Sequence, residues 1–270
     1  MRLATVTTHY GSTAALWQGG WRRLPEPDLS AFLREHAIAD APDLASDELV
    51  DAQPVVLLPT PGKVICCGLN YGDHIEETGR EKPTYPTLFA KYADTLIGPD
   101  EPIELPAGVE ADWEAELAVV VGTALRRATR AQAAAGIAGY AVANDISVRD
   151  WQRRTLQWFQ GKAWDATTPL GPVLVTPDEL DPEAGVEVVC RVNGVERQRG
   201  NTKTLVFDSA ALLAYISTFT VLRPGDVVLT GTPGGVGMAM TPPTYLADGD
   251  VVETEIAGIG ILANTVRFAA

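Results

Sequence analysis

Short apolar runs separated by turn-forming residues dominate the pattern of this chain. Seven of them are typical of β-strands, at residues 63–68, 116–121, 140–143, 173–175, 186–192, 227–230 and 251–256. Only three segments have a helical composition, at residues 130–138, 149–159 and 208–218. Because the strands outnumber the helices and do not alternate with them, the pattern predicts a strand-rich α+β fold. We expect a rolled, mixed β-sheet rather than a doubly wound parallel sheet or a parallel barrel.

The first 60 residues have a pattern of their own. Residues 3–7 and 14–17 alternate like the two strands of a hairpin, and Asp28 or Ser30 can cap a short helix that runs to Ala37. A Pro-Thr-Pro-Gly segment at residues 59–62 then interrupts the pattern. We therefore predict a small N-terminal domain over residues 1–60 and a larger domain over residues 61–270.

Composition narrows the range of partners. The chain has 35 acidic and 21 basic residues, a formal charge of −14, and no block of like basic residues. An acidic surface repels phosphate backbones and anionic lipids, so nucleic-acid and membrane roles are disfavoured. No apolar stretch approaches the length of a membrane span or of a signal peptide, which makes a cytoplasmic location the default expectation. Three cysteines without paired spacing argue against a disulfide framework.

Acidic residues mark the most informative stretch. Asp112, Glu114 and Glu116 alternate, so in a strand they would share one face. A hard divalent cation would relieve their repulsion, whereas the simpler alternative is a solvated strand edge. Asp145 follows a buried apolar run, where it can be a further metal ligand or the N-cap of the next turn.

Two further positions can carry acid–base or charge chemistry. His74 and Glu77 are three residues apart, so in a helical turn the carboxylate would orient the imidazole; the alternative is a surface pair. Lys162 lies among small and apolar residues, which suits a partly buried cation that binds an anion, or a lysine that extends to solvent. The glycine-rich residues 231–237 lack the sequence of a phosphate loop and predict a tight turn beside a ligand.

In order along the chain, several motifs resemble those of the fumarylacetoacetate hydrolase family, in particular its smaller acylpyruvase-like and hydroxymuconate isomerase-like members. The resemblance covers residues 63–268. Its motifs are Gly-Leu-Asn-Tyr at 68–71 followed by His74, Pro-Thr-Leu-Phe-Ala-Lys at 86–91, Glu-Ala-Glu-Leu at 114–117, Asn-Asp-Ile-Ser-Val-Arg-Asp at 144–150, Gly-Lys-Ala-Trp-Asp at 161–165, Leu-Thr-Gly-Thr-Pro at 229–233 and Asp-Gly-Asp-Val-Val-Glu at 248–253.

The resemblance implies a homodimer whose catalytic domain binds Mg²⁺ or Mn²⁺. It implies a role for nine residues, which fall into three groups. The metal ligands are Glu114, Glu116 and Asp145; the catalytic residues are His74 and Glu77 of a lid and Lys162; the substrate-binding residues are Gln152, Thr232 and Arg149. The resemblance leaves open whether the region of Asn70 and Asp73 supplies a fourth metal ligand.

The implied substrate is a small anionic 2-oxo or 1,3-dioxo carboxylic acid, which can chelate one divalent ion. Our main expectation is a metal-dependent hydrolase that cleaves a C–C bond in an acylpyruvate or fumarylpyruvate. The alternatives are an isomerase of the 2-hydroxyhepta-2,4-diene-1,7-dioate type, an oxaloacetate decarboxylase, and a non-catalytic family member. The sequence of residues 237–243 resembles the corresponding stretch of family members that act in aromatic catabolism.

Overall fold

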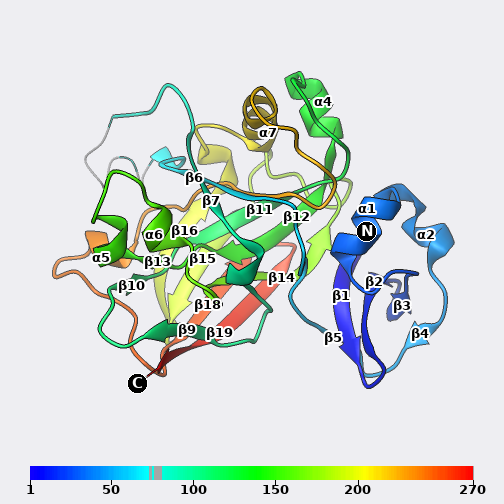
Figure 1. The fold of residues 1–270 in the computed structure, drawn as a ribbon, viewed down its shortest axis with the longest axis horizontal. Helices are drawn as coiled ribbons and strands as arrows, with labels where there is room; N and C mark the ends of the chain where they lie inside the picture. The colour runs from blue at the N-terminus through cyan, green and yellow to red at the C-terminus, as the bar shows by residue number, and fades with distance from the viewer. Residues whose placement is uncertain (73–74, 76–80, 270) are drawn as a thin grey trace.

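The computed structural model describes residues 1–72, 75 and 81–269 of the chain. Its architecture is strand-rich α+β with mixed sheets, as the sequence pattern predicts. Figure 1 shows the N-terminal segment, in blue, at one side of a larger body formed by the rest of the chain.

The N-terminal segment begins with the predicted hairpin. β1 (Arg2–Thr8) and β2 (Gly11–Trp17) pair antiparallel, and Gly11 closes the turn with a φ of +111°. Asp28 caps α1 by accepting a hydrogen bond from Ala31 N at 2.8 Å. The remaining elements of this segment are short: β3 (Trp21–Arg23), α1 (Leu29–Glu35), a 3₁₀ turn (Ile38–Asp40), α2 (Ala41–Leu44), β4 (Glu48–Leu49) and β5 (Gln53–Pro54).

One large sheet connects this segment to the rest of the protein, because β1 pairs with β14. The strand order is β4-β3-β2-β1-β14-β12-β11-β17-β6-β7, with β5 on β1 and β8 on β14. The pairs β17–β6 and β14–β8 are parallel and the others are antiparallel. The added strands are β6 (Val64–Gly68), β7 (Thr87–Lys91), β8 (Leu96–Ile97), β11 (Ala115–Val121), β12 (Ile137–Asn144), β14 (Thr168–Val175) and β17 (Val227–Leu229).

A second sheet packs against the centre of the first. Its order is β16-β15-β18-β19-β9, and β11, β12 and β14 contact it. Every residue of β11 and β12 is buried, so both faces of these central strands belong to the core. The strands are β9 (Ile103–Pro106), β15 (Glu187–Val192), β16 (Val195–Asn201), β18 (Val251–Ile256) and β19 (Gly260–Ala269), beside a small pair of β10 (Ala111–Asp112) and β13 (Ser147–Val148).

The helices differ in part from the sequence prediction. The segment 208–218 forms α7 (Ser209–Ser217), as its composition predicts, and the Asp208 side chain caps it by accepting from Ala211 N. The predicted helix 130–138 is wrong at its end, because α4 (Arg130–Ala135) stops at Gly136 and Ile137 begins β12.

The predicted helix over 149–159 is also wrong. That segment forms only α5 (Arg149–Gln152), and a second short turn, α6 (Phe159–Lys162), follows after a loop. Gly161 lets the two turns meet, because a Cβ there would lie 2.5 Å from the Gln152 Cα. Short 3₁₀ turns complete the fold, at Ala93–Thr95, Thr202–Thr204 and Gly237–Ala239.

Candidate metal and substrate site

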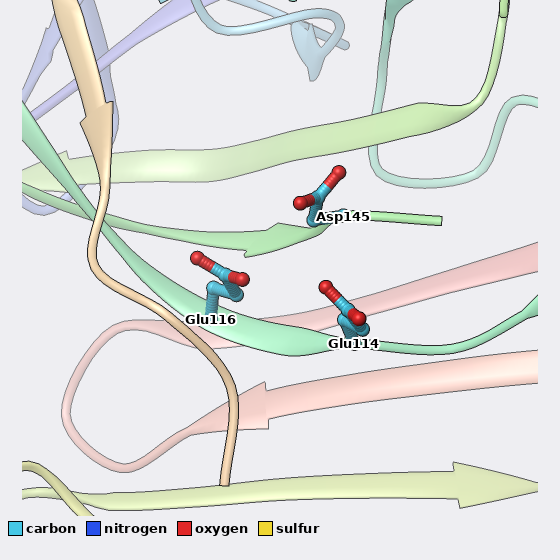
Figure 2. A group of neighbouring side chains, drawn as sticks. All are labelled: Glu114, Glu116 and Asp145. Carbon is cyan, nitrogen blue, oxygen red and sulfur yellow. The ribbon is translucent and has the colours of Figure 1, made fainter. Parts of the chain in front are cut away.

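Three buried carboxylates converge where β11 begins and its neighbour β12 ends. Glu114 lies just before β11, Glu116 is its second residue, and Asp145 follows β12. The antiparallel register pairs Ala115 with Asn144, which brings the acidic positions of both strands together. Ligand oxygens of the three side chains lie within 4.8 Å of one another, and Figure 2 shows them facing a shared space.

Electrostatics shows that this arrangement is costly without a cation. Burial raises the pKa of Glu116 well above its usual value, and the charges of Asp145 and Glu114 raise it further. The Gly231 N–H offsets part of this by donating to Glu116 Oε2 at 2.6 Å. A cluster of hard oxygen donors fits a divalent ion such as Mg²⁺ or Mn²⁺. The three side chains can therefore hold a metal.

Two lysines from distant segments supply positive charge to the carboxylates. Lys162, on α6, donates to Glu114 Oε2 at 2.5 Å and to Asp145 Oδ2 at 2.8 Å. Burial alone would lower the pKa of Lys162, but Asp145 and Glu114 outweigh it and raise the pKa. Lys91, the last residue of β7, is buried and donates to Asp145 Oδ1 at 2.6 Å. Asp145 is thus held by an ammonium group on each oxygen.

The expectation that Asp112, Glu114 and Glu116 share one strand face is wrong for Asp112. Asp112 does not join the other carboxylates on one strand face, because β10 ends at Asp112 and β11 begins only at Ala115. Instead its Oδ2 accepts from Arg149 Nε at 2.8 Å, and its Oδ1 accepts from Gly237 N at 2.7 Å. Asp112 therefore anchors Arg149, whose Nη2 lies 2.8 Å from Glu114 Oε1.

A cavity of about 620 Å³ opens beside the triad and includes several of the predicted residues. Glu114, Glu116, Arg149, Gln152, Lys162 and Thr232 all line it. Gln152 Oε1 accepts from Arg149 Nη1 at 2.9 Å, which leaves the amide NH₂ to face a ligand. The wall toward solvent includes Leu156 and Met238.

Two predicted catalytic residues, His74 and Glu77, lie outside the described residues, and so does Asp73. Asn70 is described and has a structural role. Its Oδ1 accepts from Phe207 N at 2.8 Å, and its Nδ2 donates to the carbonyls of Phe207 and Thr230 at 2.8 and 2.7 Å. Asn70 thus ties the β6 end to the loop that presents Gly231.

Sequence reasoning missed three residues of the site. Lys91 ends one of the motifs of the family resemblance, but nothing in the local sequence reveals that β7 ends beside Asp145. Arg153 lines the cavity, is half exposed and pairs with Glu110. Gln198 reaches the triad strand from β16. In each case the contact spans tens of residues, so only the fold brings the partners together.

Comparison with known proteins identifies the family. The family model described as fumarylacetoacetate (FAA) hydrolase C-terminal matches residues 63–267. The chain belongs to the fumarylacetoacetate hydrolase family. A human relative named as a mitochondrial oxaloacetate tautomerase is 43% identical over 244 residues, which cover 89% of this chain and 76% of the relative.

Solved structures of this family share the whole fold. A 5-carboxymethyl-2-hydroxymuconate delta-isomerase from Mycobacterium smegmatis is 35% identical with a TM-score of 0.82, and each chain is covered completely. A fumarylacetoacetate hydrolase from Exiguobacterium antarcticum is 35% identical with a TM-score of 0.87 over the same full coverage. Proteins named as tautomerase, isomerase and hydrolase are therefore all similar to this chain.

The fold also bears on the expectation about membranes. Within residues 1–72, 75 and 81–269, no helix has the length and apolar character that a membrane crossing needs. The cytoplasmic location stays a prediction, since the human relative is named as mitochondrial.

Proposed function

We propose that this protein is a divalent-metal-dependent isomerase that interconverts the keto and enol forms of a small 2-oxo dicarboxylic acid, of which oxaloacetate is the simplest candidate. The observation that carries the proposal is a buried carboxylate triad, open to a cation-lined cavity, in a chain 43% identical to a named oxaloacetate tautomerase. These observations support the isomerase alternative better than the C–C hydrolase of our main expectation.

Glu114, Glu116 and Asp145 would hold the metal, which supplies Lewis-acid polarisation of the 2-oxo group and its neighbouring carboxylate when bound. Arg149 and Lys162 keep the carboxylates in place around it. The Gln152 amide, fixed by Arg149, is positioned to donate to the substrate. Arg153, half exposed on the cavity wall, suits the distal carboxylate of a dicarboxylic acid.

Conversion of enol to keto moves one proton from the enol oxygen to the adjacent carbon, so it needs one acceptor and one donor and consumes no water. Lys162 suits the donor by its position, because its buried ammonium group lies on the cavity wall beside Glu114 and Asp145. We assign the acceptor to His74, oriented by Glu77, as the family resemblance implies. We also propose that the protein acts as a homodimer.

Hydrolysis of a C–C bond is the second candidate. It is favoured by the similarity to the fumarylacetoacetate hydrolase from Exiguobacterium antarcticum. The same acceptor would then take a proton from water, and the substrate would need a second carbonyl beyond the 2-oxo group.

The test is a parallel assay of the Mn²⁺- and Mg²⁺-loaded protein. Enol oxaloacetate, an acylpyruvate and a 2-hydroxymuconate are followed by the absorbance of their enol forms, and pyruvate release is measured separately. We expect rapid loss of the enol signal of oxaloacetate without pyruvate release, abolished by a chelator and by Glu116→Gln. Glu183→Gln, an exposed carboxylate paired with Arg130, is the matched control. Cleavage of the acylpyruvate with no effect on oxaloacetate would overturn the proposal.

A further inference from the structure

The buried side chain of Gln198 connects three parts of the site. Gln198 lies on β16, and its Oε1 accepts from Ala115 N, between the two glutamates, at 2.9 Å. Its Nε2 donates to Thr232 Oγ1 at 2.7 Å and to Pro233 O at 2.9 Å. The Thr232 hydroxyl in turn donates to Ala115 O at 3.0 Å. One amide thus joins the acidic strand to the loop that lines the cavity.

The direction of each of these hydrogen bonds is fixed by a backbone group. The Ala115 N–H can only donate, so the amide oxygen of Gln198 must face it. The Pro233 carbonyl can only accept, so the amide NH₂ must be on the Pro233 and Thr232 side. The Ala115 carbonyl can only accept as well, so the single hydroxyl hydrogen of Thr232 is committed to it.

Close packing keeps this arrangement rigid. β16 lies directly against the loop, since a Cβ on Gly200 would lie 2.4 Å from the Pro233 Cβ. On the other side of Gln198, a Cβ on Gly235 would lie 2.0 Å from the Arg197 carbonyl oxygen. Neither element can shift toward the other, so the amide has little freedom to release Thr232.

We propose that Gln198 is a positioning residue that makes the Thr232 hydroxyl a hydrogen-bond acceptor, and not a donor, toward the substrate. Thr232 lines the cavity, and the only bonding capacity its oxygen retains is a lone pair. A ketone or carboxylate oxygen has no hydrogen to offer that lone pair. An enol hydroxyl has one, so the Gln198–Thr232 pair favours the enol form of the acid.

This inference rests on the proposed function, which makes enol and keto forms the two ligands of one site. It adds to that function a means of distinguishing them. A site that merely chelated a 2-oxo acid would gain nothing from a fixed acceptor at this position, whereas a tautomerase must bind the form that carries the extra hydroxyl hydrogen.

The experiment compares two monoanions of the same size, lactate, which has a hydroxyl donor, and pyruvate, which has none. Their affinities are measured by calorimetry with the Mn²⁺-loaded protein and with Thr232→Val, Thr232→Ser and Gln198→Met. We expect Thr232→Val to weaken lactate about fivefold relative to pyruvate, the usual effect of one hydrogen bond. Thr232→Ser should keep the wild-type ratio. Gln198→Met should shift it toward pyruvate, because without the amide NH₂ that fixes its oxygen the Thr232 hydroxyl can turn away from Ala115 O and donate to the ligand. Thr204→Val is the matched control, since that exposed hydroxyl also donates to a backbone carbonyl.

The outcomes separate the inference from the function. If Thr232→Val weakens pyruvate as much as lactate, or leaves both unchanged, the acceptor role is wrong while the proposed function stands. If the wild-type protein binds neither acid, this inference fails, whereas the proposed function is decided by the enol oxaloacetate assay. Melting temperatures are recorded for each variant, and if Gln198→Met does not fold, the Thr232 pair of variants decides the matter alone.

Discussion

Two hollows in this protein have comparable size and very different chemistry. The cavity beside the triad, about 620 Å³, is bordered by four almost completely buried charged side chains, Glu114, Glu116, Arg149 and Lys162. The second, about 440 Å³, lies where the N-terminal segment meets β14 and is lined by Arg2, Trp17, Trp21 and Glu179 among others. The side chains of Arg2 and Glu179, which form an ion pair there, are 40% and 43% exposed.

The difference teaches that buried charge, and not hollow space, marks the functional site. Because water screens the Arg2–Glu179 pair, this ion pair contributes little to the free energy of folding. The ions around Glu114 and Asp145 have lost their hydration, and such groups persist only where partners compensate them. The protein has assembled those partners from β7, α5 and α6, far apart along the chain.

The largest effect is expected for Lys162→Met. It removes the assigned proton donor and one of the two ammonium groups on Asp145, so turnover of enol oxaloacetate should fall by about 10²–10⁴-fold. Stopped-flow absorbance measures the rate, with Lys203→Met on the exposed 3₁₀ turn as the control. Wild-type turnover in Lys162→Met would remove Lys162 from the mechanism.

Glu116→Gln should separate metal binding from stability. Because burial and neighbouring charges raise the pKa of Glu116, the folded state holds its proton more tightly than the unfolded state does. The metal-free protein therefore loses stability as pH rises above the ordinary carboxyl range, and Glu116→Gln should abolish that loss.

The same variant should no longer gain stability from Mn²⁺. Thermal unfolding at pH 5 and pH 8, with and without Mn²⁺, measures both effects. A metal-induced stabilisation equal to that of the wild type would exclude Glu116 as a ligand.

Lys91→Met tests a partner that does not line the cavity. Loss of its ammonium group leaves Asp145 Oδ1 without its buried donor. The affinity for Mn²⁺ should therefore fall by about 10–100-fold, as it does for other residues that orient a metal ligand. Calorimetric titration of the metal checks this, again against Lys203→Met. An unchanged dissociation constant would limit Lys91 to folding.

The smallest effect is expected in the second hollow. Arg2→Ala breaks a partly exposed ion pair, worth about 0–1 kcal/mol of stability, and leaves turnover unchanged. Urea unfolding and the oxaloacetate assay measure the two quantities. A loss of turnover in this variant would contradict the contrast between the two hollows and give the N-terminal segment a part in catalysis.

Local pattern located the N-terminal hairpin and, at least in part, seven further strands, whereas the grouping of Glu114, Glu116 and Asp145 came from the family resemblance. Alternation located β11, and the apolar run before Asp145 located the end of β12. Local pattern was insufficient wherever a contact between residues distant in the sequence decides the local structure. The helix predicted over 149–159 ends at Gln152, on which Gly161 packs closely, a contact that the local sequence does not reveal.

The same limit applies to the site. Asp112 has the spacing of a ligand, yet its partners are Arg149 and the N–H groups of residues 237–238. Lys91 and Gln198 have ordinary local surroundings and acquire roles only through pairing of distant strands. A sequence shows which residues can carry charge, whereas the fold decides which charges meet.

The Gly231 backbone has a consequence for how this scaffold can diversify. With a φ of +100° and a Cβ position only 2.9 Å from the Asn70 Cβ, residue 231 tolerates no side chain, so the backbone N–H that holds Glu116 cannot be repositioned by substitution there. Leu156, at the rim, is 99% exposed and is free to vary. Redesign for longer or bulkier acids should therefore begin at the rim, where changes alter reach and selectivity while the chemistry below is inherited intact.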